Sequence, residues 1–157
     1  MATRNRMPPW HENFKAPSGR ELLIRPIRPE DGAPLQGAFA LFGPEEVRDR
    51  FLQAVDVLSD ETAQRLTHPN PKTEISLVAA EPLPPGEAVV GAVARASIIP
   101  GTRDAEYAIL VSRFLAGQGL GRQLMRKLVN WARGKYLDRM YGDIAQDNEP
   151  ALPTAPS

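Results

Sequence analysis

The sequence predicts a mixed α/β fold, in which an antiparallel meander of strands leads into a strand, helix, strand crossover and helices cover both faces of the sheet. Three observations predict it. Stretches rich in β-branched and aromatic residues recur along the chain, a glycine-rich loop joins one of them to an amphipathic helix, and a short strand follows that helix. The chain has 157 residues, of which 42% are hydrophobic, enough for one compact core.

Five stretches have the composition and alternation typical of strands. The expected strands are residues 21–27, 73–81, 88–99, 106–111 and 139–144. The antiparallel meander is expected to run through the first four of them. The fifth follows the long helix and is expected to complete the crossover.

Helices are expected between the first two strands and after the glycine loop. The first of them begins at Pro29, a second spans 44–54, and a third runs from Ser59, its expected N-cap, to Leu66. The helix after the loop has apolar residues at helical spacing, namely Leu120, Leu124, Leu128 and Trp131. Gly134 suits the left-handed position just past its end.

The chain ends differ in composition from this domain. Residues 1–18 show no periodicity and are expected to form a flexible arm that Trp10 and Phe14 could pin to the body. Residues 19–149 are expected to form the domain. The tail, 150–157, carries prolines that cannot build a helix.

Composition excludes several functional classes. The 19 basic and 19 acidic residues balance, so no bulk attraction to nucleic acid or membrane is implied. No cysteine is present, which rules out disulfides and thiolate metal sites within this sequence and agrees with a cytoplasmic location. No metal site is expected. The sequence also lacks an apolar run of membrane length.

The loop from Gly117 to Arg122 has the residue types of an anion site. Its glycines let backbone amides approach a ligand, and the positive end of the following helix favours a phosphate. Between Tyr107 and Leu137 the chain has six cationic residues and no Asp or Glu. The alternative, that the glycines only turn the chain and the charges are ordinary solvated helix charges, stays open at this point.

Three known sequence patterns of phosphate-binding loops can be compared with residues 117–122. A P-loop needs Lys-Ser or Lys-Thr after its last glycine, where this chain has Arg122-Gln123. A dinucleotide fingerprint needs a sixth-place glycine, where Arg122 stands. The sequence Gly117-Gln118-Gly119-Leu120-Gly121-Arg122 resembles the coenzyme A pyrophosphate loop of the GNAT superfamily of N-acetyltransferases, except that Ala116 replaces the usual Gln or Arg.

The resemblance extends beyond the loop, to 25–31, to 44–68, to Tyr141-Gly142-Asp143 and to Asn148-Glu149. Together these segments resemble the acetyltransferase domain of the bacterial Pat-type protein lysine acetyltransferases. The resemblance implies a GNAT fold whose fourth and fifth strands splay apart to admit acetyl-CoA as cosubstrate. Relative to that family, the helix and strands expected after Glu149 are missing.

The resemblance also implies site residues. Glu106 matches a glutamate that serves as general base, and the residues matched to cofactor contacts are Ile109, Leu110, Val111, Gly117, Gln118, Gly119, Leu120, Gly121, Arg122 and Asn148. Two alternatives stay open: Glu106 paired with Arg95 or Arg103, and Asn148 as a turn residue. Burial is expected to raise the pKa of Glu106.

The expected function is transfer of an acetyl group to an amine, most simply a protein lysine, with an acyl-CoA synthetase as the implied protein substrate. The alternative is an acetyl-CoA-binding regulatory or truncated module with weak or no turnover. A homo-oligomer would cover the open sheet edge. Arg50, Asp56 and His68 either touch the acceptor or are merely solvated, and His68 is expected to be a loop or helix-end histidine.

Overall fold

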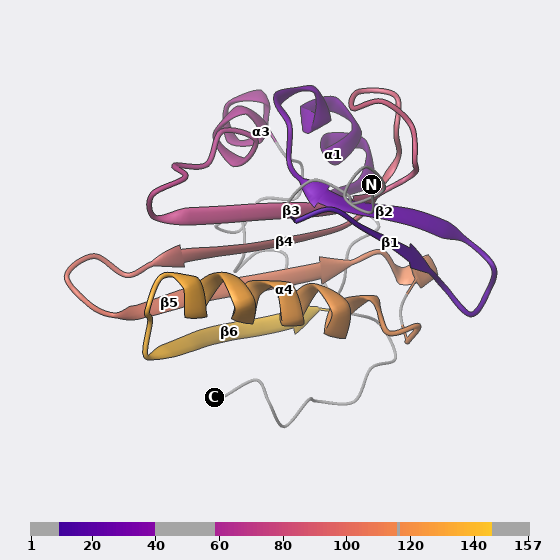
Figure 1. Cartoon of the computed structure of the whole chain (residues 1–157). Coiled ribbons are helices and arrows are strands. Elements are labelled where there is room, and N and C mark those ends of the chain that lie inside the picture. Colours follow the sequence, from indigo (N-terminus) through magenta and orange to yellow (C-terminus); the bar gives the residue numbers. More distant parts are fainter. Residues whose placement is uncertain (1–9, 40–58, 116, 146–157) are drawn as a thin grey trace, which may run out of the picture.

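The computed structural model describes residues 10–39, 59–115 and 117–145. Its six-stranded sheet has the order β1-β2-β3-β4-β5-β6 (Figure 1). All neighbouring strands are antiparallel except β5 and β6, which are parallel. The strands are β1 (Glu12–Lys15), β2 (Glu21–Pro26), β3 (Glu74–Ala80), β4 (Val90–Ile98), β5 (Asp104–Val111) and β6 (Arg139–Ala145). The predicted mixed fold, a meander followed by a crossover, is confirmed.

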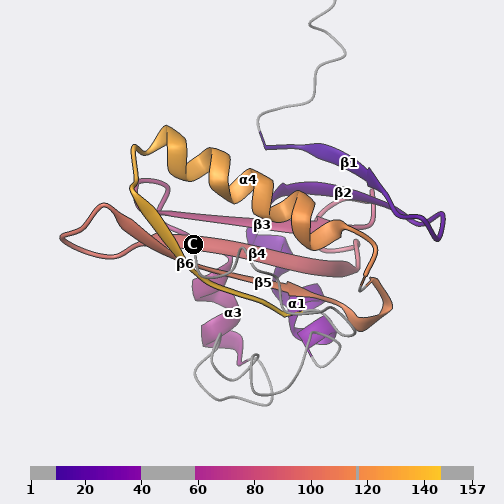
Figure 2. The same cartoon turned by 90° about the horizontal axis from the view of Figure 1, so that it is seen from below.

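Helices cover both faces of the sheet, as predicted. α1 (Gly32–Ala38) and α3 (Asp60–Leu66) lie on one face, and α4 (Leu120–Gly134) lies on the other (Figure 2). Short 3-10 turns, Pro29–Asp31 and Arg113–Leu115, precede α1 and the glycine loop respectively. The helix expected over 44–54 falls outside the described residues. No helix within 10–39, 59–115 or 117–145 has the length and apolarity to cross a membrane.

The helical spacing after the loop is confirmed. Leu120, Leu124 and Leu128 are fully buried against the sheet, and Trp131 is nearly so. Burying each leucine is worth about 1.5–3 kcal/mol, so this stripe holds α4 over β3, β4 and β5. The opposite face has its own apolar cluster, in which α1 and α3 pack on Val78, Val93 and Leu110.

The N-terminal boundary differs from the expectation. Residues Glu12–Lys15, assigned above to the flexible arm, form edge strand β1, paired with β2 from Glu12 opposite Ile24 to Lys15 opposite Glu21. The Glu12 carboxylate also accepts a hydrogen bond from Gln123 and lies 2.7 Å from Lys127 Nζ, so α4 holds this strand. Trp10 and Phe14 pack against the core, as suggested.

Two helix ends test the capping predictions. Ser59 Oγ accepts a hydrogen bond from the Thr62 N–H at 3.1 Å, which confirms Ser59 as the N-cap of α3. The prediction for Gly134 is wrong, because α4 runs through Gly134 and Tyr136 takes the left-handed position with φ 60°. The Tyr136 N–H reaches the Arg133 carbonyl, and the Leu137 N–H reaches the Ala132 carbonyl, both at 3.0 Å. These two bonds form a Schellman motif around a tyrosine instead of a glycine.

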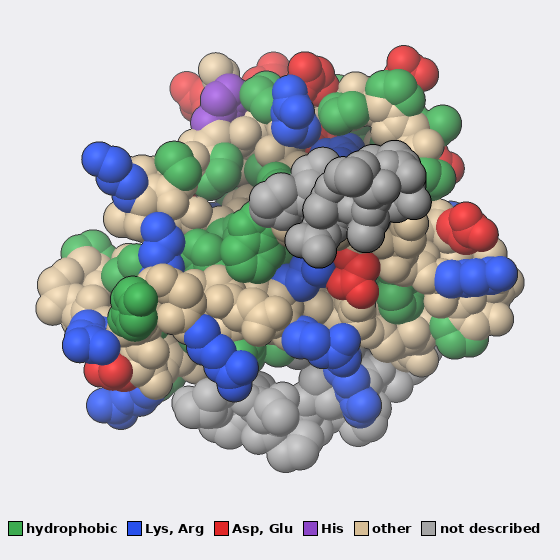
Figure 3. Space-filling model, viewed as in Figure 1, with side chains coloured by type: hydrophobic (Ala, Val, Ile, Leu, Met, Phe, Trp, Pro, Cys, Tyr) green, Lys and Arg blue, Asp and Glu red, His purple; other side chains and the backbone are tan. Residues whose placement is uncertain are grey.

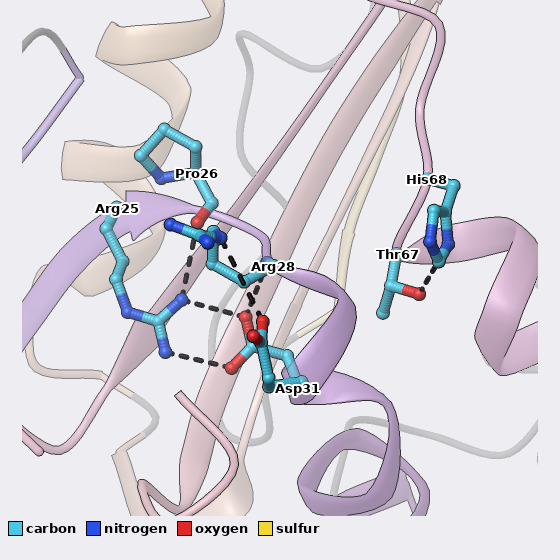
Figure 4. Close-up of polar contacts among 7 residues, drawn as sticks. Arg25, Pro26, Arg28, Asp31, Thr67 and His68 are labelled. Carbon is cyan, nitrogen blue, oxygen red and sulfur yellow. Dashed lines mark hydrogen bonds and ion pairs between the residues drawn. The ribbon is translucent and has the colours of Figure 1, made fainter. Parts of the chain in front are cut away.

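A buried ion pair ties the end of β2 to the start of α1 (Figure 4). Arg25 Nη1 and Nη2 donate to the two carboxylate oxygens of Asp31, each at 2.8 Å. Asp31 also accepts from the Arg28 N–H at 2.7 Å. Charge-assisted, bidentate bonds of this kind fix geometry strongly, so they set the angle at which the chain leaves the sheet.

The splay expected between the fourth and fifth strands is not present where both are described. These strands are β5 and β6, and they pair at every position from Asp104 opposite Arg139 to Leu110 opposite Ala145. Gly142 permits this close pairing, because a Cβ there would overlap the Tyr107 carbonyl. The prediction that these two strands splay apart is therefore wrong for residues 104–110 and 139–145. The chain beyond 145 lies outside the described residues.

Candidate active site

The glycine loop lies between β5 and the first turn of α4. Gly117 and Gly119 have φ of 74° and 90°, the left-handed region that favours glycine, and Gly119 is the N-cap residue of α4. Lack of space does not explain why glycine occupies either position, because nothing lies within 4 Å of the point that a Cβ would occupy. Their role is conformational, because glycine adopts positive φ without the steric cost that other residues have.

The main-chain donors of this loop are uncommitted within the described residues. No N–H from Gly117 to Arg122 donates to a described acceptor, and the first helical bond is Gln123 N–H to the Gly119 carbonyl at 3.2 Å. No side chain caps the helix. Gln118 Nε2 donates to the Phe114 carbonyl at 3.2 Å, while its buried Oε1 has no partner in the described part of the chain. Free amides at the positive end of a 15-residue helix fit a pyrophosphate.

Cationic side chains continue this site along α4. Arg122, Arg126 and Arg133 are exposed and recur at helical spacing, so they share one outer stripe. Figure 3, viewed as Figure 1, shows Lys and Arg side chains spread over the face on which α4 lies. The charges reinforce the helix dipole near the loop and favour an anionic ligand there.

The three strand residues matched to cofactor contacts are not equivalent. The Ser112 N–H donates to the Gly91 carbonyl of β4 at 2.9 Å, so alternation turns the main-chain groups of Leu110 toward β4. Those of Ile109 and Val111 face β6, where Ile109 is paired with Ile144. Val111 lies one position past the last pair. Among the described residues, the main-chain groups of Val111 are therefore open to a ligand, whereas those of Ile109 would become open only if β6 moved away.

Glu106 is exposed, and the burial expected for it is not found. It lies in a row across four strands, formed by directly opposed residues: Glu74 on β3, Ser97 on β4, Glu106 on β5 and Tyr141 on β6. This row is on the face that carries α1 and α3. The neighbouring Ser97 and Ala108 are small, which leaves the Glu106 carboxylate accessible to an incoming amine.

Neither alternative partner holds Glu106. Arg103 lies 3.7 Å from Asp138, and Arg95 lies 3.8 Å from Glu74. No hydrogen bond or ion pair among the described residues involves the Glu106 side chain. In this part of the chain, no hydrogen bond or ion pair therefore supports the alternative that Glu106 is a paired structural carboxylate, and only a longer-range attraction to Arg95 remains.

Among the described residues, Arg95 is the group whose pKa departs clearly from its ordinary value. Burial lowers the pKa of Arg95 from its usual value, Glu74 opposes that shift, Arg65 adds to it, and Glu106 also opposes it. Arg95 is therefore close enough to both carboxylates to feel them. The sequence analysis considered Arg95 only as a partner of Glu106 or as free of it, and not as a partly buried cation that lies beside Glu74.

The remaining candidates divide into two groups. His68 directly follows α3, and its Nδ1 lies 2.7 Å from the Gln64 carbonyl and 3.2 Å from Thr67 Oγ1 (Figure 4), which confirms a helix-end histidine. Asn148, Arg50 and Asp56 lie outside the described residues. Within the described ranges, no group of three or more His, Asp or Glu side chains could hold a metal ion.

The comparisons with known proteins agree on the family. The sequence profile of the Acetyltransferase (GNAT) family matches residues 45–155. The GNAT domain of S. lividans PAT has a similar structure, with a TM-score of 0.70, 22% identity, and 87% of this chain and 80% of that chain covered.

Two further structures share the fold. A cAMP-binding acyltransferase from Mycobacterium smegmatis is similar with a TM-score of 0.54 and 20% identity, over 88% of this chain and 39% of that one. This chain thus spans about two fifths of that protein. A GNAT-family acetyltransferase from Streptococcus pneumoniae has a TM-score of 0.52 and 18% identity, over 77% and 73% of the two chains.

The profile covers more than half of the chain, and the matched residues include β5, the glycine loop and α4. The chain therefore belongs to the GNAT family of N-acetyltransferases, and its domain resembles the Pat type.

Proposed function

We propose that this protein transfers the acetyl group of acetyl-CoA to the side-chain amine of a protein lysine, with Glu106 as general base. The proposal rests on two features that lie close together in the sequence, one on β5 and the other on the loop that follows it. The loop after β5 presents uncommitted amides, and β5 itself presents a carboxylate without a described partner.

The distance between these features selects an elongated cosubstrate. Val111 is five positions after Glu106, and an extended strand covers about 17 Å over five residue steps. A compact phosphate ester held at the loop would not reach Glu106. The thioester of acetyl-CoA lies at the far end of a long pantetheine arm, which can run along β5 from the loop toward Glu106 once β6 moves away from this part of β5.

Proton removal is the chemical task of the protein. A lysine ammonium, with a reference pKa of about 10.4, is almost fully protonated at neutral pH and cannot attack. An accessible Glu106 carboxylate attracts the ammonium, and binding of the acceptor then excludes water from the pair. The proton moves to Glu106, the amine nitrogen bonds to the thioester carbonyl carbon, and the carbon–sulfur bond breaks. The nitrogen gives its second proton to the departing sulfur, so coenzyme A leaves as the thiol.

The loop and α4 contribute binding and orientation. Amides from Gly117 to Arg122 would hold the pyrophosphate, and the main chain near Val111 would hold the arm. A β5 amide beside the thioester would meet the developing oxyanion. The Pat-type resemblance points to a lysine of an acyl-CoA synthetase as the acceptor. That acceptor class is part of the proposal and rests on the resemblance alone.

The test has two stages with the purified chain. Calorimetric titration with acetyl-CoA measures binding first, and transfer of labelled acetyl to a lysine of an acyl-CoA synthetase measures turnover second. Glu106→Gln should keep the affinity within about twofold and lower the transfer rate by about 10²–10⁴-fold. Glu21→Gln, at an exposed glutamate of β2, is the matched control and should change neither.

Each other outcome counts against a stated part of the proposal. If acetyl-CoA does not bind, the function is wrong. Binding with no transfer to any lysine would indicate an acetyl-CoA-binding module instead of an enzyme. Transfer that persists unchanged in Glu106→Gln would remove Glu106 as the base.

A further inference from the structure

A cavity of about 600 Å³ lies beside the start of β3, at the end of α4 that is far from the glycine loop. Its walls come from separate parts of the chain: Trp10, the end of β2, the residues after α3, the start of β3 and the last turn of α4. We call this cavity the edge pocket. Since α4 has 15 residues and each adds about 1.5 Å, about 20 Å separate the edge pocket from the glycine loop. Cavities of this volume hold small ligands.

The main chain at the start of β3 faces the edge pocket with two residues. The Ile98 N–H of β4 donates to the Thr73 carbonyl at 2.9 Å, so alternation along an antiparallel pair turns the main-chain groups of Glu74 and Ser76 away from β4. These groups therefore point to the side of β3 on which β2 ends and the edge pocket lies. Glu74 and Ser76 both line that pocket.

Two of these four main-chain groups have partners. The Glu74 N–H donates to the Asn70 carbonyl at 2.7 Å, and the Ser76 carbonyl accepts from the Ile27 N–H at 3.0 Å. Among the described residues, no group bonds to the Glu74 carbonyl or to the Ser76 N–H. Buried main-chain groups are nearly always bonded, and Ser76 is only 6% exposed, so a bound molecule is expected to supply the missing partners.

The open carbonyl and the open N–H select a compact partner. They belong to two residues of one extended strand that are two positions apart, and they lie between the bonds that Asn70 and Ile27 make to β3. A further strand has no room there, because those two residues already take the places beside β3. The edge of a nucleobase, which carries a hydrogen-bond donor next to an acceptor, has the required pair of groups.

Two indole rings also line the edge pocket. Trp131 of α4 is buried in the core, and Trp10 is partly buried against that core. Nucleobases stack on aromatic side chains. These rings therefore favour a planar base over a flexible amide that has the same pair of hydrogen-bonding groups.

The charge of the lining favours an anionic group. Lys135 Nζ lies 3.4 Å from the Pro71 carbonyl and has no carboxylate partner in the described part of the chain. Glu74 is the acidic residue of the lining, and its carboxylate already accepts from the Asn70 N–H at 2.8 Å and lies 3.8 Å from Arg95. Lys135 thus leaves the pocket with an uncompensated positive charge that a phosphate would neutralise.

We propose that the edge pocket binds a mononucleotide, with the edge of the base on Glu74 and Ser76 and the phosphate beside Lys135. In AMP, the amino group of the base would donate to the Glu74 carbonyl, and the neighbouring ring nitrogen would accept from the Ser76 N–H. This inference goes beyond the proposed function, because binding of a nucleotide here requires no acetyl transfer.

Titration of the ¹⁵N-labelled full chain with AMP, GMP, CMP and UMP, followed by NMR, tests the site. At least one nucleotide should move the signals of the Ser76 amide and the Trp131 indole, with a Kd below about 1 mM. A derivative of that nucleotide, methylated so that the base edge loses its donor, keeps the ring and the phosphate. It leaves the Glu74 carbonyl unpaired, so its Kd should be about fivefold higher or more.

The phosphate contact has its own variant and control. Lys135→Glu should raise the Kd of the nucleotide about three- to tenfold, and should leave that of the nucleoside, which has no phosphate, within about twofold. Arg20→Glu makes the same change of charge at an exposed residue outside the pocket and should alter neither Kd.

The other outcomes are decisive as well. A Kd above about 1 mM for all four nucleotides, or an equal Kd for the methylated derivative, overturns the site. Gly119→Ala should weaken the binding of acetyl-CoA and leave that of the nucleotide unchanged. If the nucleotide binds and acetyl-CoA does not, the proposed function fails and the edge pocket stands. If acetyl-CoA displaces the nucleotide, the pocket is part of the cofactor site and the inference is wrong.

Discussion

Arg25 and Asp31 form a buried bidentate ion pair, with side chains 5% and 0% exposed and two nitrogen–oxygen contacts of 2.8 Å. This pair joins the end of β2 to the turn that starts α1. Since α1 packs on the sheet beside α3, the pair determines how the helical layer sits above the face that carries Glu106.

Breaking this pair should be costly. Arg25→Met leaves the Asp31 carboxylate buried without its cation, and we expect the free energy of unfolding to fall by about 3–5 kcal/mol. Urea denaturation followed by circular dichroism measures it. Arg28→Met, at an exposed arginine 4.0 Å from Glu30, is the control and should change stability by less than about 0.5 kcal/mol. A loss in Arg25→Met no larger than this control would contradict the assignment.

Gly119 should be required for cofactor binding more than for folding. Gly119→Ala forces a Cβ into a left-handed conformation, costs about 1–2 kcal/mol locally, and turns the loop amides from their present directions. We expect the affinity for acetyl-CoA, measured by calorimetry, to fall at least about tenfold. Gly134→Ala, inside α4 and with open space for a Cβ, should leave affinity unchanged and raise stability by about 0.5–1 kcal/mol. Unchanged affinity in Gly119→Ala would argue against the loop as the phosphate site.

Gly142 should be essential for the pairing of β5 with β6. A Cβ at this position meets the backbone of Tyr107, which cannot rotate away, so Gly142→Ala should destabilise the protein by about 1–3 kcal/mol and loosen β6. Hydrogen exchange of the β6 amides measures the loosening directly. Gly37→Ala, in α1 with no atom within 4 Å of the added Cβ, is the control and should not loosen β6. Equal exchange in both variants would mean that β6 tolerates the extra carbon.

Tyr136 carries strain that a glycine would relieve. A non-glycine residue in the left-handed region costs about 1–2 kcal/mol, and the tyrosine side chain is 78% exposed, so little packing offsets that cost. Tyr136→Gly should therefore raise the melting temperature, by an amount equivalent to about 1 kcal/mol. Tyr136→Ala removes the same ring but keeps the Cβ, and it should give no such gain. If both variants behave alike, the ring and not the backbone conformation determines the effect.

Local patterns were sufficient wherever the relevant interactions are close in sequence. The spacing of Leu120, Leu124 and Leu128 predicted which face of α4 is buried, and Ser59 predicted the start of α3, because helix periodicity and capping involve residues within one or two turns. The glycine loop was also evident from residue types alone. Gly117 and Gly119 have positive φ, a conformation that glycine adopts at little cost in free energy.

The tertiary structure decided everything that depends on contacts between distant segments. Glu12 forms a strand because β2 pairs with it and Lys127, more than a hundred residues later, binds its carboxylate. Likewise, the pairing of β5 with β6 and the exposure of Glu106 depend on which strands become neighbours. The sequence by itself determined the order of elements, the loop and the family resemblance, whereas register and burial arise only when the whole sheet assembles, because no local pattern specifies which strand lies beside which.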